Sequence, residues 1–261
     1  MQLIRSIRGG SELLYRVGLA HLAIFFVFFA LSQFDHRQTM GLNTWLKPMK
    51  FAVSIWIYLW TFGWLLLQQK DRTSKVRWIS YGIAITMVIE MLLIGFQAGR
   101  AQASHFNFSN YFNETVYRFM GLAIGINFLL NFYTMLLFYR SQIPLDKPML
   151  AAVRSGFVLF LLASSVGWIM VAQSGHAVGT TDGGPGLPFL NWSLESGDLR
   201  VAHFLGMHAL QILPISAWLF SRFSDNPYFP LVGVIATAAF LAAVFIAALI
   251  QALSGQPLIS L

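Results

Sequence analysis

The feature that most constrains this chain is a series of long runs without a charged side chain. Six such runs are residues 17–34, 51–69, 119–139, 155–181, 201–221 and 226–261. A seventh, residues 78–99, is interrupted only by Glu90. Each reaches the roughly 18 residues that a transmembrane helix needs. A backbone in lipid is satisfied only in helices or closed barrels, and these runs exceed the roughly 10 residues of a barrel strand. We therefore predict an all-α fold, a polytopic transmembrane bundle of seven helices.

These runs leave no room for a soluble domain. We predict a single transmembrane domain over residues 1–261, with helices at residues 13–31, 50–68, 76–97, 115–139, 150–172, 199–220 and 229–253. Asp35, His36 and Arg37 follow the first run without a small-residue cleavage site, which favours a retained helix over a removed signal peptide. The longest connection, residues 173–198, is rich in Gly and Pro and also carries apolar side chains. This connection is either a lid over a pocket or a plain connector, and the sequence does not distinguish the two roles.

The charge pattern predicts an orientation for the bundle. The chain has 17 Lys and Arg residues against 10 Asp and Glu residues. Most basic residues precede the first run or lie in alternate connections, among them Arg8, Lys70, Arg72 and Lys147. Basic connections stay in the cytoplasm, so we expect a cytoplasmic N-terminus and an outside C-terminus, in the inner (plasma) membrane. Because these residues serve orientation, nucleic acid is not an expected partner. Cysteine is absent from the sequence, which excludes disulfides and thiolate chemistry.

Several predicted helices carry polar side chains along one face. At 100° per residue, four sets of residues each share a face: Lys50, Ser54, Thr61 and Gln68; Glu90 and Gln97; Asn127, Asn131 and Thr134; Arg200, His203, His208 and Gln211. The opposite face of the last helix has a seam of Ala202, Gly206 and Ala209, which favours close packing, and Pro214 predicts a kink there. We expect the four polar faces to line one outward-opening pocket.

Glu90 is the sharpest indication of a functional site. An ionised carboxylate deep in a membrane costs several kcal/mol unless it is paired or wetted. We expect Lys50 or Arg200 as its partner, with protonation as the alternative. A buried ion pair that only fixes helix packing is also open.

The histidines are candidate acid–base groups and metal ligands. His105, His203 and His208 lie toward the predicted outer side. The five-residue spacing of His203 and His208 places their rings about 140° apart on a regular helix, so the two cannot share one small ion. Each remains a candidate divalent-metal ligand with partners on other helices, or a proton relay without metal. A haem held by His21 and His208 is a weaker alternative.

A polar segment at residues 97–113 forms the predicted rim of the pocket. Arg100 is a candidate anion clamp, His105 a base or ligand, and Asn107 a substrate contact; an interfacial aromatic belt is the alternative. Lys47 is expected to extend to lipid headgroups, whereas Lys50 faces the pocket. Together Lys50, Arg100 and Arg200 would attract a carboxylate or phosphate.

The segments KPMKFAVSI, QAGRAQASHFN and GGPGLPFLNWS…GDLRVAHFLGMHALQ resemble a group of bacterial multi-pass membrane proteins. The resemblance covers most of the chain and implies a membrane fold without implying a reaction. The chain is also similar to seven-helix ceramidase-like and adiponectin-receptor-like hydrolases in helix number. It departs from their metal pattern, because His203 and His208 replace a closer histidine pair and no early His-x3-Asp accompanies them.

Three functional hypotheses are consistent with these observations. The first is a membrane-embedded enzyme or cofactor-binding protein for a lipidic or small anionic ligand, with Glu90, His105, His203 and His208 as acid–base groups. Lys50, Arg100, Asn107, Arg200 and Gln211 would bind its substrate. The second is a proton-coupled transporter or channel, and the third is a structural or assembly subunit. Association into a homo-oligomer is open for all three.

Overall fold

The computed structural model describes residues 2–69, 74–140, 142–224, 226 and 228–259, without the side chains of residues 2–5. Within these ranges, seven helices are long and apolar enough to cross a membrane. They are Glu12–Phe34, Leu46–Leu67, Ser74–Gly99, Tyr111–Arg140, Lys147–Ala172, Leu199–Phe223 and Phe229–Leu253. The predicted seven-helix, all-α membrane fold is confirmed, and its helices contact the lipid bilayer. Lys70 and Arg72, used for the predicted orientation, lie outside the described residues.

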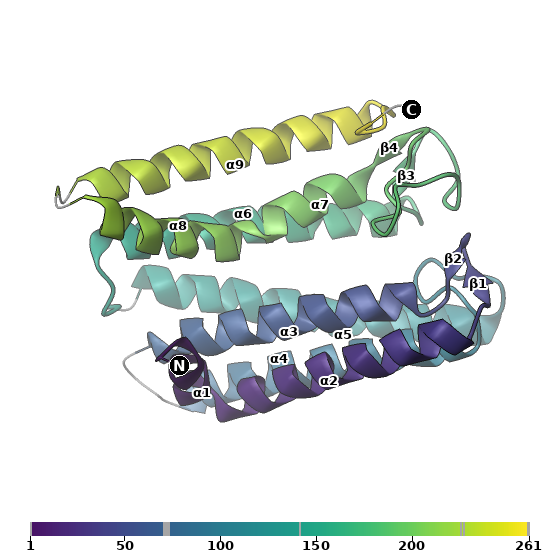
Figure 1. The fold of residues 1–261 in the computed structure, drawn as a ribbon, viewed down its shortest axis with the longest axis horizontal. Coiled ribbons are helices and arrows are strands. Elements are labelled where there is room, and N and C mark those ends of the chain that lie inside the picture. Colours follow the sequence, from purple (N-terminus) through teal and green to yellow (C-terminus); the bar gives the residue numbers. More distant parts are fainter. Residues whose placement is uncertain (1, 70–73, 141, 225, 227, 260–261) are drawn as a thin grey trace. The chain divides into compact units, whose positions relative to one another are not determined.

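The chain divides into two compact units, residues 1–134 and 135–261. The first unit contains α1 (Gln2–Gly10), α2 (Glu12–Phe34), α3 (Leu46–Leu67), α4 (Ser74–Gly99) and most of α5 (Tyr111–Arg140). A short hairpin of β1 (Gln38–Thr39) and β2 (Leu42–Asn43) joins α2 to α3 (Figure 1). We call the end of this unit that holds the hairpin, the end of α4 and the start of α5 its hairpin end.

Helix α1 is an element that the sequence analysis did not predict, because nine residues are too short to span a membrane. It packs against α3 through a very close contact of Gly10 with Gly63. A Cβ on Gly10 would overlap the carbonyl oxygen of Gly63, so only glycine allows this approach. Ile7 is buried on the same side. The contact holds α1 where α2 begins.

The second unit contains the end of α5, α6 (Lys147–Ala172), α7 (Leu199–Met207), α8 (Ala209–Phe223) and α9 (Phe229–Leu253). The strands β3 (Ala177–Val178) and β4 (Gly197–Asp198) pair in antiparallel fashion and so close the loop of residues 173–198 at its base (Figure 1). The predicted small-residue seam is confirmed: a Cβ on Gly206 would lie 2.6 Å from the Cβ of Ala163 and 2.9 Å from the ring of Phe245. The role of the loop as a lid stays a prediction.

The sixth membrane span differs from the continuous, proline-kinked helix that we predicted. Its interruption lies at His208, between α7 and α8, whereas Pro214 lies inside α8. The reason is local competition for one carbonyl group. The ring Nδ1 of His208 lies 2.7 Å from the carbonyl oxygen of Phe204, which also accepts the backbone N–H of His208 at 3.3 Å.

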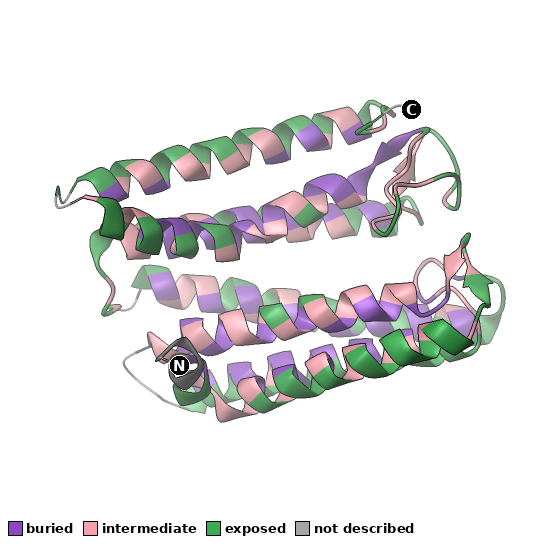
Figure 2. Ribbon diagram, viewed as in Figure 1, coloured by how far each residue is buried: buried purple, intermediate pink, exposed green. Residues whose placement is uncertain are grey.

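Apolar side chains cover the outer surface of both units. Figure 2 shows exposed and half-buried residues along most of α9 and along the second half of α2. Large exposed side chains there include Phe26 and Phe29 on α2, and Val232, Phe240 and Ile250 on α9. Such surfaces are normal for helices whose solvent is lipid.

Candidate functional site

A polar cluster lies at the hairpin end of the first unit. We call Lys47, Glu90, Ser104 and His105 the Glu90 cluster. Lys47 Nζ lies 3.1 Å from His105 Nδ1, and Ser104 Oγ lies 3.1 Å from the same nitrogen. Ser104 is 2% exposed. The cluster thus joins α3, α4 and the loop after α4.

The local chain path brings these residues together. Helix α4 ends at Gly99, and Ala101 then adopts a left-handed conformation (φ 52°) that turns the chain back. The hydroxyl of Thr44 donates to the carbonyl of Ala98 at 3.1 Å, which ties the start of α3 to the end of α4. As a result, His105 lies against the first turn of α3.

Glu90 itself is 1% exposed. Neither carboxylate oxygen has a hydrogen-bond partner within the described part of the chain. The charge of Lys47 acts on it. Glu90 lies seven residues before Gln97 on α4, which is about 10 Å deeper along the helix. The cluster therefore contains a buried acid whose hydrogen-bonding capacity is unused.

Lys47, which we expected to extend to lipid headgroups, instead lies against His105, whereas the pairing of Lys50 with Glu90 stays a prediction. Helix α3 begins at Leu46, earlier than predicted, so Lys47 lies in its first turn. Trp45 anchors this start: its ring stacks on Phe28 at 5.5 Å, and its Nε1 donates to Asp35 at 2.9 Å. The proposed pairing with Arg200 is discussed below, because Arg200 belongs to the second unit.

The imidazole of His105 lies outside the membrane-spanning helices and is kept neutral. Burial lowers the pKa of His105 well below its ordinary value, and the positive charge of Lys47 lowers it further. A neutral imidazole can accept a hydrogen bond at Nδ1 from the Lys47 ammonium group. His105 is therefore an acceptor at neutral pH.

A hydrogen-bonded network lies deeper in the same unit, next to Glu90. The hydroxyl of Tyr58 donates to Asn127 Oδ1 at 2.8 Å and to Asn131 Oδ1 at 2.7 Å as alternative acceptors. Asn127 Nδ2 donates to Thr86 Oγ1 at 2.9 Å. Thr86 is one helical turn from Glu90 on α4. The network joins α3, α4 and α5 through Tyr58, Thr86 and Asn127, whereas Ser54 is exposed. The outward-opening pocket that the four polar faces were expected to line stays a prediction.

The rim residues Arg100 and Asn107 are engaged in local structure. Arg100 Nη1 donates to Gln97 Oε1 at 2.8 Å and to Asn113 Oδ1 at 2.9 Å, and its guanidinium lies 4.8 Å from the ring centre of Phe112. Asn107 Nδ2 donates to the carbonyl of Ala103 at 2.9 Å. Their roles in anion and substrate binding stay predictions.

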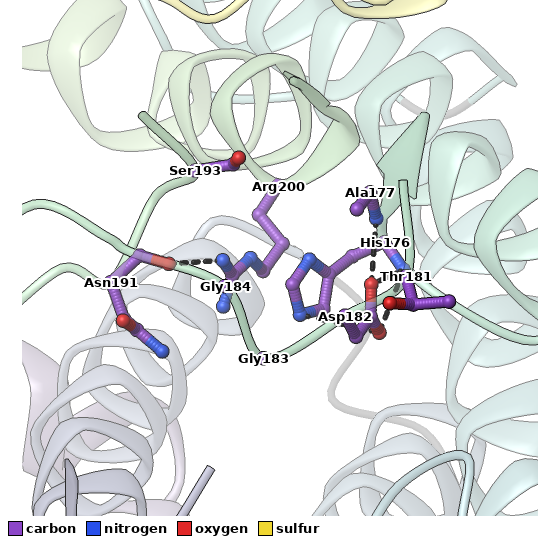
Figure 3. A pocket seen from close by; sticks show the side chains of 9 residues that line it. All are labelled: His176, Ala177, Thr181, Asp182, Gly183, Gly184, Asn191, Ser193 and Arg200. Carbon is purple, nitrogen blue, oxygen red and sulfur yellow. Dashed lines mark hydrogen bonds and ion pairs between the residues drawn. The ribbon is translucent and has the colours of Figure 1, made fainter. Parts of the chain in front are cut away.

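A second polar cluster forms in the loop at the base of α7, in the second unit. We call His176, Asp182, Asp198 and Arg200 the His176 cluster; Figure 3 shows His176, Asp182 and Arg200. His176 Nε2 lies 3.3 Å from Asp182 Oδ2, and its Nδ1 lies 3.7 Å from Asp198 Oδ1. Arg200 Nη2 donates to Asp198 Oδ2 at 2.6 Å and also bonds the carbonyl of Asn191. His176, Asp182 and Arg200 line a cavity of about 10 Å³, about the smallest that holds one water molecule.

Asp198 is the most extensively hydrogen-bonded member of the second cluster. Burial by itself would raise the pKa of Asp198, but the hydrogen bond and charge of Arg200 outweigh it, and the pKa is lowered. The backbone N–H of Ser193 and the nearby His176 act in the same direction. The sequence analysis did not select His176 as a site residue, although its short spacing from Asp182 within the loop is visible in the sequence. Arg200, a predicted substrate-binding residue, pairs with Asp198, and its role in substrate binding stays a prediction.

The remaining predicted histidines bond to backbone carbonyls. His203 Nδ1 lies 2.7 Å from the carbonyl oxygen of Ala163, and His208 Nδ1 bonds Phe204 as described above. Gln211 is half-buried on α8. The described residues include no group of three His, Asp or Glu side chains placed to hold a metal ion. The hypothesis of a metal site on His105, His203 and His208 therefore gains no support from the geometry.

Comparison with known proteins does not place the chain in a family. No protein-family model, no curated protein and no solved structure matches it.

Proposed function

We propose that this integral membrane protein performs a proton-coupled function in which Glu90 takes up and releases a proton within the bilayer, most simply as a proton-coupled small-molecule transporter of the inner membrane. The observation that carries the proposal is the state of Glu90. It is buried, its two oxygens have no hydrogen-bond partner among the described residues, and the charge of Lys47 acts on it.

The oxygens of a purely structural buried carboxylate would accept hydrogen bonds. Buried polar groups that only hold helices together are hydrogen-bonded, because an unpaired group costs about 1–3 kcal/mol. Two opposing effects act on Glu90: exclusion of water favours the carboxylic acid, and the charge of Lys47 favours the carboxylate. A group held between such effects suits reversible protonation. Binding of a proton to Glu90 also requires no cavity next to the carboxyl group.

Lys47 and His105 supply a route between Glu90 and the hairpin end. His105 accepts a hydrogen bond at Nδ1, and Ser104 Oγ lies within reach of the same atom. The predicted orientation places this end outside. On the side of Glu90 away from the hairpin end lies a network of uncharged hydrogen-bonding groups, formed by Thr86, Asn127 and Tyr58. We infer exchange with the outer solution through Lys47 and His105.

The direct test is an infrared titration of the protein in lipid nanodiscs. We expect the carbonyl stretch of a buried carboxylic acid to change with pH in the wild type and to be absent in Glu90→Gln. Glu114→Gln is the matched control, because Glu114 lies on α5 and pairs with Arg118 at 2.6 Å near the surface. An identical signal in Glu90→Gln would remove the basis of the proposal.

A functional test follows in proteoliposomes with a pH-sensitive dye inside. An imposed pH gradient should decay faster with the wild type than with Glu90→Gln, and Glu114→Gln should behave as the wild type. Equal decay in all three preparations contradicts a proton-translocating role.

One further observation favours an enzyme as a second candidate. Ser104 Oγ lies 3.1 Å from His105 Nδ1, the distance of a nucleophile from its base. Such a pair would suit acyl transfer from a lipidic substrate. A serine-reactive phosphonate should then label the wild type and leave Ser104→Ala unlabelled. Equal labelling of both rejects this candidate.

A further inference from the structure

A second candidate binding site lies at the opposite end of the first unit, where α2 and α4 begin. A cavity of about 280 Å³ opens there. Its lining residues are Gly10, Ser11, Leu13, Val76, Arg77, Ser80 and Tyr81. The first three come from the junction of α1 and α2, and the others from the first two turns of α4 (Figure 1). The cavity is therefore far along α4 from Glu90.

Ser80 presents an unused hydroxyl group to this cavity. It is 4% exposed, and within the described ranges its side chain has no interaction partner. Other hydroxyls on the spanning helices donate to a carbonyl one turn back, as Thr86, Ser155 and Ser164 do at 2.7–2.9 Å. A serine in a membrane helix normally makes this bond. Ser80 instead keeps its hydroxyl available to an occupant of the cavity.

The charge at this end is positive and partly uncompensated. Arg8 and Arg16 both pair with Glu12, at 2.6 and 2.8 Å. Arg77 lines the cavity, is exposed, and pairs with no acidic side chain among the described residues. The site therefore offers a guanidinium group, which suits a phosphate.

The position of the cavity indicates its occupant. It lies near the starts of the membrane-spanning helices α2 and α4, where we expect the lipid headgroups. Trp78 and Tyr81 are 75% and 50% exposed on the same stretch of α4, as in the aromatic belts of membrane interfaces. A group that enters from the lipid meets Arg77 and Ser80 beside the apolar side chains of Leu13 and Val76.

We propose that this cavity binds the phosphate-bearing headgroup of an anionic phospholipid. Arg77 pairs with the phosphate, and the hydroxyls of Ser80 and Tyr81 donate to its oxygens. Leu13 and Val76 contact the upper part of the acyl chains. Gly10, at the end of α1, lines the cavity and is held in place by its close contact with Gly63. The site is separate from the Glu90 cluster and does not depend on the function proposed there.

Native mass spectrometry of the full chain in detergent, titrated with phosphatidylglycerol or phosphatidylcholine, tests the proposal. The wild type should prefer phosphatidylglycerol. Arg77→Gln should lower this preference about tenfold, because it removes a charge-assisted hydrogen bond, and Ser80→Ala about threefold. Lys75→Gln is the matched control: Lys75 is exposed at the same end but does not line the cavity, so the preference should change by less than about twofold.

The controls distinguish a lipid from free phosphate. Inorganic phosphate and glycerol phosphate should fail to displace phosphatidylglycerol at equal concentration. Displacement by either would overturn the assignment to a lipid. Unchanged preference in Arg77→Gln, with a melting temperature equal to the wild type, would overturn the site itself.

Discussion

The Glu90 cluster of the first unit and the His176 cluster of the second both bury a carboxylate, and they surround it differently. Glu90 is 1% exposed and Asp198 2% exposed. Asp198 accepts from Arg200 and from the backbone of Ser193, and it also caps α7. Glu90 has only the charge of Lys47 and no hydrogen bond within the described chain. The comparison separates a carboxylate that maintains structure from one that remains available for chemistry.

Removal of Asp198 should have the largest effect on stability. Asp198→Asn leaves Arg200 without its counter-charge and weakens the start of α7, so we expect a loss of about 3 kcal/mol in the free energy of unfolding. Denaturation of the detergent-solubilised protein, followed by circular dichroism, measures it. Asp182→Asn is the control with the smaller loss, because Asp182 lacks an arginine partner in the described network. Equal losses would remove the distinction between the two aspartates.

The pH dependence should separate the clusters next. The pKa of His105 is lowered in the folded state, so the unfolded chain binds more protons once the pH falls below about 6.5. Stability should therefore decline as the pH falls below about 6.5, until the folded-state pKa is passed. The pKa of Asp198 is also lowered, so its contribution is present above about 3.9 and lost only at lower pH. In His105→Gln, the melting temperature should depend less on pH just below pH 6.5 than it does in the wild type. An equal pH dependence in both proteins would contradict the lowered pKa of His105.

Tyr58→Phe tests the network beneath Glu90. It removes one hydroxyl that serves two alternative asparagine acceptors, so we expect a loss of about 1.5 kcal/mol, measured by the same denaturation. Tyr133→Phe on α5 is the matched control, because Tyr133 is exposed. A loss in Tyr133→Phe as large as in Tyr58→Phe would show that the network adds no stability of its own.

Glu90→Gln should have the smallest effect on stability, despite its burial. Because no hydrogen bond is lost, we expect the free energy of unfolding to change by no more than about 1 kcal/mol. The contrast with Asp198→Asn is the point of the measurement. A loss of about 3 kcal/mol in Glu90→Gln would indicate an ion pair that holds helices together.

Several parts of the candidate site were predictable from the sequence. Glu90 is recognisable in the sequence as a single acidic residue inside an apolar run. The shared face of Asn127 and Asn131 follows from helical periodicity. Lys47 was misplaced because helix starts are the least certain boundaries, and its anchor is a contact of Trp45 with Phe28 on another helix. His176 was not selected as a site residue, because a loop has no periodicity to indicate which of its side chains meet.

The sequence alone determined that this chain forms seven membrane helices, because hydrophobic length and missing charges require no partner to be recognised. It also determined that Glu90 would be buried. Only the tertiary structure decided that the charge of Lys47 acts on Glu90, and that the Glu90 oxygens have no hydrogen-bond partner among the described residues. It also decided that Asp198 accepts hydrogen bonds from Arg200 and Ser193. Those outcomes depend on how side chains from different helices and loops meet. Hydrogen bonds between residues far apart in the sequence are set by tertiary packing and cannot be read from the order of residues.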